Sequence, residues 1–244
     1  MTSDDAGVIV SKETCSSCDF YYDNSSRVKK KQFSSLSELS NAVSSSKKKY
    51  NCIVGVSGGV DSSYVLFKAV SMGLRPLAVH MDNGWNSELA QNNIKNLVDK
   101  LGVDLFTYVI DWEEYRELMN AFFRADVVDV ELLYDNAMLA VNYKLARQHK
   151  IKYILAGTNH VTEGVPMPSN WNWFKYDARN IKSIVSQNSK TQIKSMPTIG
   201  VSKWVYSTYV LGIQWIDFLD YIEFSKQEAL NELIDKFDYK PYPY

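Results

Sequence analysis

Apolar residues along this chain form short continuous runs that alternate with longer segments of helical spacing. The runs lie at residues 52–56, 77–81, 105–110 and 153–156. The helical spacing extends over residues 62–72, 87–101, 112–125 and 136–149. Short apolar runs predict buried strands, and apolar positions repeated every three to four residues predict amphipathic helices. Because strands separated by helices of crossover length pair in parallel, the pattern predicts an α/β fold, a doubly wound parallel sheet with helices on both faces.

The two flanks of this alternating region differ from it. Residues 1–50 are rich in Ser and Lys and contain one short helical pattern, at 33–43. After the fourth apolar run come helical patterns at 178–187 and 201–211, an apolar piece at 215–222 and a capping sequence at 225–228 that opens a last helix. We therefore predict an N-terminal appendage over residues 1–50 and one main domain over residues 51–244, whose C-terminal part is helical.

Composition narrows the class of protein. With 27 basic and 28 acidic residues, the sequence lacks the basic surface of a duplex-binding protein, although a local tRNA-binding surface stays open. Its apolar runs are far shorter than the roughly 20 residues that cross a bilayer, and residues 1–5 are acidic where a signal peptide is basic. Three cysteines do not form a disulfide framework. We expect a cytoplasmic protein without a membrane partner, and nucleic acid binding is a minority interpretation.

The strand expected at 52–56 runs into a turn rich in glycine and hydroxyl groups. Its residues are Ser57, Gly58, Gly59, Val60, Asp61, Ser62 and Ser63. Adjacent glycines let the backbone approach an anion, hydroxyls donate hydrogen bonds, and the unpaired amides at a helix start attract negative charge. A carboxylate among phosphates is repulsive unless a cation lies between them, so Asp61 indicates Mg²⁺ and a polyphosphate. A turn that binds nothing is the alternative.

Further polar residues follow the other expected strands. They are Asp82, Asn83 and Gly84, then Asp111, then Gly157, Thr158, Asn159 and His160. Parallel sheets bind ligands at the carboxyl ends of their strands, so these residues are expected to surround one ligand. Gly157 and Thr158 would receive a phosphate, and Glu163 would share Mg²⁺ with Asp61. Alternatively, Thr158 only caps a helix and Glu163 lies on the surface.

The turn resembles the S-G-G-x-D-S signature of the PP-loop ATP pyrophosphatase superfamily. This resemblance implies a Rossmann-like fold of the adenine nucleotide alpha hydrolase type. It also implies an enzyme that uses ATP and Mg²⁺, places AMP on a substrate oxygen and releases pyrophosphate. Ser57, Asp61 and Ser62 are then the candidate catalytic residues, and Asp82 is a candidate nucleotide contact. Residues 157–163 resemble the G-T-x-H-x-x-E element of NAD synthetases, in which the glutamate, here Glu163, helps to hold magnesium.

Other segments resemble the N-acetyl sugar amidotransferases of lipopolysaccharide and nonulosonic acid pathways. They are residues 163–171, residues 175–180 and the V-x-x-D-N-G-W segment that ends at Trp85. This resemblance implies that the acetamido group of a nucleotide-linked sugar is adenylated and that ammonia replaces AMP to give an acetamidino sugar. It assigns substrate binding to Trp171, Lys175, Asp177 and Arg179, with core packing as the alternative for the tryptophan. It also implies a separate glutaminase subunit with a barrel-like companion, because Thr2 stands where a glutaminase needs a cysteine.

The sequence departs from that family in two places. Family members carry two N-terminal cysteine pairs that resemble a zinc knuckle, whereas this chain offers only Cys15 and Cys18, so zinc, which needs four ligands, is not expected there. Relatives continue beyond the position of Tyr244, so a truncated product is one interpretation. The alternatives are another PP-loop adenylating enzyme, such as a tRNA thiolase or an NAD-synthetase-like ligase, and a non-catalytic ATP-binding module.

Overall fold

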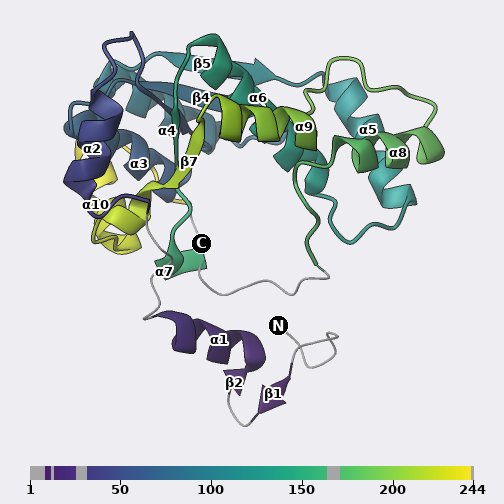
Figure 1. Cartoon of the computed structure of the whole chain (residues 1–244), viewed down its shortest axis with the longest axis horizontal. Helices are drawn as coiled ribbons and strands as arrows, with labels where there is room; N and C mark the ends of the chain where they lie inside the picture. The colour runs from purple at the N-terminus through teal and green to yellow at the C-terminus, as the bar shows by residue number, and fades with distance from the viewer. Residues whose placement is uncertain (1–8, 12–13, 26–31, 164–170, 243–244) are drawn as a thin grey trace.

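Five parallel strands form the centre of the structure, a computed structural model that describes residues 9–11, 14–25, 32–163 and 171–242. The strands are β3 (Cys52–Gly55), β4 (Pro76–Asp82), β5 (Leu105–Val109), β6 (Tyr153–Ala156) and β7 (Gln214–Asp217). Their order in the sheet is β5-β4-β3-β6-β7, and every neighbouring pair is parallel. Figure 1 labels β5, β4 and β7 of this sheet. The predicted α/β fold with a doubly wound parallel sheet is therefore confirmed.

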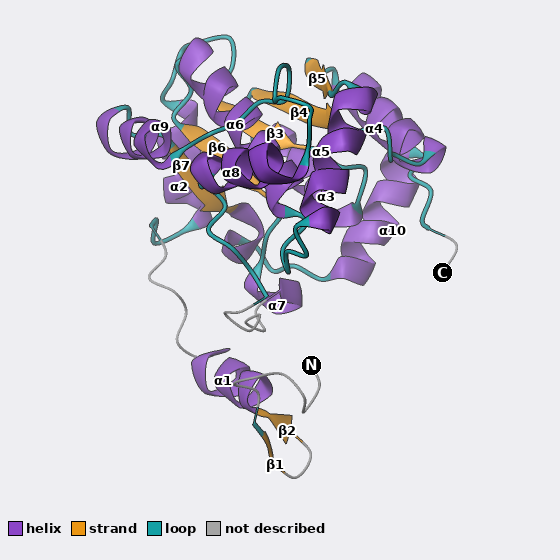
Figure 2. Ribbon diagram, turned by 90° about the vertical axis from the view of Figure 1, so that its right-hand side faces the viewer, coloured by secondary structure: helices purple, strands orange, loops and turns teal. Residues whose placement is uncertain are grey.

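Side chains of the strands alternate between two hydrophobic layers, one on each face of the sheet. Cys52 and Val54 of β3 belong to one buried layer, and Ile53 between them belongs to the other. The first layer is covered by α2 (Leu36–Ser44), α3 (Val60–Ser71), α4 (Glu88–Leu101) and α10 (Lys226–Phe237). The second is covered by α5 (Trp112–Arg124), α6 (Leu132–Gln148) and α8 (Ala178–Asn188). Helices consequently lie on both sides of the orange strands in Figure 2.

Polar caps fix where several helices begin and end. Ser87 Oγ accepts a hydrogen bond from the amide of Ala90 at 3.1 Å, and Ser225 Oγ accepts one from the amide of Glu228 at 3.4 Å. The capping sequence predicted at 225–228 thus opens α10. Gly102 ends α4 with a φ of 63°, a left-handed conformation that glycine adopts without strain.

The C-terminal part contains helices, as predicted, and one further strand. The apolar piece at 215–222 contains the end of β7 and the 3-10 helix η2 (Phe218–Tyr221). The helix expected at 201–211 is a short α9 (Val201–Val205) followed by a π-helical turn, η1 (Tyr206–Val210). Helix α6 also begins earlier than expected, at Leu132.

Residues 9–11 and 14–25 form a small unit that lies apart from the sheet (Figure 1). A hairpin of β1 (Val10–Ser11) and β2 (Thr14–Cys15) leads into α1 (Ser16–Ser25), which lies below the main body in Figure 1. The ring of Tyr21 faces His160 of the short helix α7 (His160–Glu163), with centroids 5.6 Å apart. Helix α2, in contrast, contributes Leu39 and Val43 to the core. The domain boundary at residue 50 stays a prediction.

No helix in the described ranges is both long enough and apolar enough to span a bilayer.

Candidate active site

The glycine- and serine-rich turn joins the carboxyl end of β3 to the first turn of α3. The hydroxyl oxygens of Ser57 and Ser62 are 3.1 Å apart, and Ser62 Oγ also donates to the carbonyl of Gly59 at 3.3 Å. Within the described residues, the amides of Val60, Asp61 and Ser62 have no hydrogen-bond acceptor. The turn therefore presents unused donors at the positive end of a helix dipole, which is the arrangement that binds phosphate.

Two glycines allow close backbone packing around this turn. Gly58 has a φ of 82°, and a Cβ there would lie 2.7 Å from the carbonyl oxygen of Ala90 in α4. A Cβ at Gly157, just after β6, would lie 3.1 Å from the amide nitrogen of Ser62. A side chain at either position would push backbone segments apart. At Gly59 a Cβ would make only an ordinary contact at 3.5 Å, so the packing of the protein itself does not require that glycine.

Three carboxylates gather beside the turn. They come from α3, α7 and the end of β7, and are Asp61, Glu163 and Asp217. The Thr158 hydroxyl donates to Asp217, which joins the ends of β6 and β7. Burial raises the pKa of Asp61, and burial together with the charges of Asp61 and Asp217 raises the pKa of Glu163. The Lys226 ammonium at the start of α10 opposes both pKa shifts.

Asp61 and Glu163 have the chemistry of an Mg²⁺ site. Mg²⁺ prefers one or two carboxylates together with phosphate oxygens and water. Asp61 Oδ1 is buried and has no hydrogen-bond partner within the described part of the chain, so it is an acceptor that lacks a donor. No group of three or more His, Cys, Asp or Glu side chains among the described residues is arranged to hold an ion alone. The two carboxylates fit a cation that arrives with a polyphosphate.

The cysteine pair lies elsewhere, at the start of α1. The Sγ atoms of Cys15 and Cys18 are 3.4 Å apart, and hydrogen bonds from Cys18 lower the pKa of Cys15. The pair supplies two sulfur atoms, half the number of ligands in a structural zinc site.

Asp82, a predicted nucleotide contact, fixes the turn that follows β4. Its Oδ1 accepts hydrogen bonds from the amide of Gly84 and from Asn86 Nδ2, both at 2.9 Å. Asn86 Nδ2 also lies 3.3 Å from Nε2 of the buried His80, whose Nδ1 donates to the Val56 carbonyl at 2.8 Å. A carbonyl oxygen only accepts, so the proton is on Nδ1. His80 thus connects the end of β3 to the turn after β4.

The residues predicted to bind substrate lie around the starts of α6 and α8. Lys175 Nζ is held between Asp129 Oδ2 at 2.8 Å and Asp135 Oδ2 at 2.9 Å. Although burial opposes its charge, hydrogen bonds with these two carboxylates raise the pKa of Lys175. Asp177 caps α8 by accepting from the amide of Asn180 at 2.9 Å. Both side chains are therefore engaged within the protein.

Trp171 and Trp173 line a cavity of about 670 Å³ beside α8. Trp173 is 52% exposed, yet its orientation is fixed, because its amide donates to Asp129 and its indole nitrogen donates to Asp177 Oδ2 at 3.1 Å. Core packing does not account for a side chain with this exposure. Arg179, on the first turn of α8, is exposed as well. No described hydrogen bond or ion pair joins Lys175, Asp177 or Arg179 to the turn at 57–63.

The sequence of this chain matches a known protein family. Residues 34–166, more than half of the chain, match the NAD synthase family. This chain belongs to the NAD synthase family. NAD synthetases are members of the PP-loop ATP pyrophosphatase superfamily, so the superfamily predicted from the turn at 57–63 is confirmed, and with it the class of ATP-dependent ligases. Membership of the N-acetyl sugar amidotransferases stays a prediction. A search of curated proteins finds no match.

Several solved structures are similar in fold. The NH3-dependent NAD synthetase from Campylobacter jejuni subsp. jejuni NCTC 11168, in complex with the nitrate ion, is 12% identical with a TM-score of 0.41 over 91% of this chain and 90% of that chain. The NMN synthetase from Francisella tularensis is 15% identical with a TM-score of 0.40 over 82% and 88% of the two chains. The glutamine-dependent NAD+ synthetase from Acinetobacter baumannii, in complex with adenosine diphosphate, is 14% identical with a TM-score of 0.43 over 80% and 41%. These values are too low to carry an argument about function.

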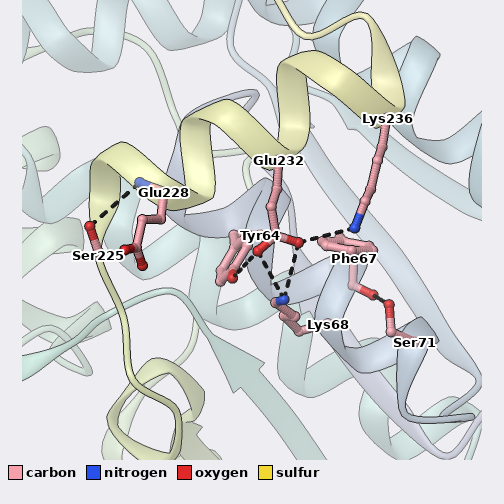
Figure 3. Close-up of polar contacts among 8 residues, drawn as sticks. All are labelled: Tyr64, Phe67, Lys68, Ser71, Ser225, Glu228, Glu232 and Lys236. Carbon is pink, nitrogen blue, oxygen red and sulfur yellow. Dashed lines mark hydrogen bonds and ion pairs between the residues drawn. The ribbon is translucent and has the colours of Figure 1, made fainter.

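In this NAD synthase family member, α10 lies outside the matched region and packs along α3. Glu232 Oε1 accepts hydrogen bonds from the Tyr64 hydroxyl at 2.9 Å and from Lys68 Nζ at 3.2 Å. Glu232 Oε2 accepts from Lys236 Nζ at 3.1 Å (Figure 3). The helix that begins in the turn at 57–63 is therefore held along its length by the last helix of the described chain.

Sequence reasoning missed three residues of this site: His80, Asp217 and Lys226. The pattern of apolar residues does not identify β7 as a strand, so it does not predict a site residue at its end. The available signal for Asp217 is an acidic residue directly after Trp215 and Ile216. Ser63, which the sequence groups with the phosphate-binding hydroxyls, has a buried side chain, and its amide already donates to the carbonyl of Gly59 at 3.1 Å.

Proposed function

We propose that this chain is a magnesium-dependent, AMP-forming ligase that joins ammonia to an adenylated acceptor. One observation carries the proposal: unused amides at the start of α3 and the carboxylates Asp61 and Glu163 meet at the same edge of a parallel sheet. The amides suit phosphate oxygens, and the carboxylates suit the cation that accompanies them. A site that only sensed ATP would have less need of carboxylates for a metal ion.

The proposed reaction has two steps. An acceptor oxygen attacks the α-phosphorus of ATP, the bond between the α-phosphorus and the bridging oxygen breaks, and pyrophosphate leaves. Ammonia then attacks the activated carbon, the carbon–oxygen bond breaks, AMP leaves with that oxygen, and a proton passes to solvent. When bound, Mg²⁺ supplies charge neutralisation for the phosphates.

The residues of this chain have separate tasks in this scheme. The amides of residues 60–62 and the hydroxyls of Ser57 and Ser62 bind phosphate oxygens and stabilise developing negative charge. Gly157 lets the end of β6 pack closely against the backbone of Ser62, and the Thr158 hydroxyl, which donates to Asp217 without nucleotide, is a candidate phosphate donor. Asp61 and Glu163 hold the cation, and Asp82 shapes the turn that borders the nucleotide.

A carboxylate is the acceptor that family membership supports best, because an amide then forms directly from ammonia. The second candidate is the acetamido group of a nucleotide-linked sugar. It is supported by the sequence elements at 163–171, of which residues 164–170 lie outside the described residues, and at 175–180. It is also supported by the cavity that Trp171 lines, with Lys175, Asp177 and Arg179 as further candidates. For this second candidate, ammonia would come from a separate glutaminase subunit with a barrel-like companion.

The test is a product analysis with both acceptor classes. The protein is incubated with ATP, MgCl₂ and ammonium chloride, together with either the deamidated form of NAD or a set of acetamido sugar nucleotides. We expect AMP and pyrophosphate in equal amounts with one acceptor class, and no sustained cleavage without an acceptor. ADP as the product would contradict the proposal, as would the absence of cleavage with every acceptor. Ammonium chloride removes the need for the glutaminase subunit in this assay.

A further inference from the structure

The segment that follows α10 returns to the phosphate-binding turn. Asp238 ends the helix with a φ of 54°, and the next residue, Tyr239, is 4% exposed. The Tyr239 hydroxyl donates a hydrogen bond to the carbonyl oxygen of Gly58 at 2.8 Å. A side chain from the far end of the chain thus contacts the backbone of the turn itself.

This contact controls the direction of a donor inside the turn. In a planar trans peptide the C=O and N–H groups point in opposite directions. Holding Gly58 O on the Tyr239 side therefore directs the amide of Gly59 to the other side, where Ser57 Oγ lies 3.4 Å from it. The restraint matters because Gly58 has a φ of 82° and lacks a side chain, so its backbone is otherwise free to rotate.

Tyr239 is itself held on both sides. Asn93 of α4 is buried, its Nδ2 donates to the carbonyl of Lys240 at 2.9 Å, and its Oδ1 accepts from the amide of Lys240 at 2.9 Å. On the other side, α10 is bound to α3 through Glu232 (Figure 3). The hydroxyl therefore has a fixed position relative to α3 and α4, the two helices that border the turn.

We propose that Tyr239 is a positioning residue that orients the Gly58–Gly59 peptide for ATP binding. The inference rests on the proposed function of the turn and adds to it a residue outside the part of the chain matched to the family. The hydroxyl remains a hydrogen-bond donor over the working pH range, because burial, with smaller contributions from the charges of Tyr242 and Asp61, raises the pKa of Tyr239 to about 12.

The test compares Tyr239→Phe with a matched control, Tyr108→Phe. The Tyr108 hydroxyl also donates to a backbone carbonyl at 2.8 Å, that of Ser195, away from the turn. Dissociation constants for ATP with MgCl₂ are measured by calorimetry, and amide hydrogen exchange is followed over residues 57–63 without nucleotide. We expect Tyr239→Phe to weaken ATP binding about 3- to 10-fold, the effect of one neutral hydrogen bond, and to speed exchange in the turn. Tyr108→Phe is expected to change neither.

The outcomes separate this inference from the proposed function. Equal ATP affinity and equal exchange in Tyr239→Phe and the wild type would overturn the positioning role, whatever the turnover. An equal loss in both variants would also overturn it, because the effect would then be general. Wild-type protein that binds ATP but forms no AMP would refute the proposed reaction and leave the positioning role standing if Tyr239→Phe binds more weakly.

Discussion

At Asp61, the charge that would bind a cation also lowers the stability of the folded protein. Its carboxylate is partly buried, one oxygen has no hydrogen-bond partner within the described residues, and burial raises its pKa. An acid whose folded-state pKa is above its unfolded value destabilises the protein as the pH rises through that interval. At neutral pH the ionised side chain therefore costs stability until a cation arrives.

We predict that Asp61→Asn separates these two effects. The amide removes the buried charge, so the variant without nucleotide should melt at the same temperature as the wild type or higher at pH 7, as measured by calorimetry. AMP formation at saturating MgCl₂ should fall about 100-fold or more, because a ligand of the cation that neutralises the reacting phosphates is lost. Asp99→Asn, on the exposed side of α4, is the control for a change of charge. Wild-type turnover in Asp61→Asn would remove this residue from the metal site.

His80 shows that the role of a side chain can depend on the fold and not on the sequence around it. Its place in a strand was predictable from the apolar run at 77–81. Its role was not, because both partners, the Val56 carbonyl and Asn86, depend on how β3 and β4 pair and on the turn that follows β4. For Lys175, the sequence suggested a role in substrate binding but not the neighbours of its side chain. Its position beside an acidic pair, Asp129 and Asp135, appears only when the start of α6 folds next to it.

At the scale of elements, α3 is important because it carries the turn at 57–63 at one end and packs against α10 along its side. Glu232 accepts hydrogen bonds from Tyr64, Lys68 and Lys236 (Figure 3). Although burial opposes ionisation of this carboxyl, these bonds lower the pKa of Glu232. Stability from such a group is present above its unfolded pKa and is lost as the pH falls through its folded pKa.

We predict that Glu232→Gln destabilises the fold in a pH-dependent manner. The glutamine still accepts from Tyr64 but has no charge for the two lysines, so the free energy of unfolding should fall by about 0.5–1 kcal/mol at pH 7, a value typical of partly exposed ion pairs. In urea titrations this difference from the wild type should shrink toward zero at acidic pH, where the wild-type carboxyl is protonated. A difference that persists unchanged in acid would mean that the charge is not responsible. Glu223→Gln, which is exposed, controls for the loss of one charge.

Elements with strong periodicity were predictable, and β7 shows why others were not. The strands at 52–56 and 153–156 are continuous apolar runs buried on both faces, and such runs are recognisable in the sequence. In β7 only Trp215 and Ile216 of the four residues are apolar, and the strand is defined by its pairing with β6. The sequence therefore indicated Asp61, Gly157 and Thr158 at the sheet edge, whereas Asp217 required the fold.

For the whole molecule, the proposed nucleotide site is where separate parts of the fold meet. The turn at 57–63 contacts α4 at Ala90, borders β6 at Gly157 and is held by Tyr239 after α10. A ligand bound there is in contact with elements from most of the main domain. Its binding energy should therefore stabilise the whole domain against unfolding rather than one loop.

We predict that ATP with MgCl₂ raises the melting temperature in a single transition. Binding to the folded state alone adds about 2.7 kcal/mol at a ligand concentration 100 times the dissociation constant. ATP with EDTA should give a smaller shift, because Asp61 and Glu163 then face the phosphates without a cation. Differential scanning calorimetry measures both shifts. Equal shifts with MgCl₂ and with EDTA would show that these carboxylates do not bind the metal.

The hydrogen bond from Tyr239 to Gly58 has a consequence for biosynthesis, because its two ends are 181 positions apart. At ribosomal speeds of about 5–20 residues per second, the turn leaves the exit tunnel roughly 10–40 s before its tyrosine partner. All five strands, the last of which ends at Asp217, precede Tyr239 in the chain, so the sheet can pair before the contact between the tyrosine and the turn forms. Under the proposed function, a nascent chain that still lacks Tyr239 therefore binds nucleotide about 3- to 10-fold more weakly than the finished polypeptide.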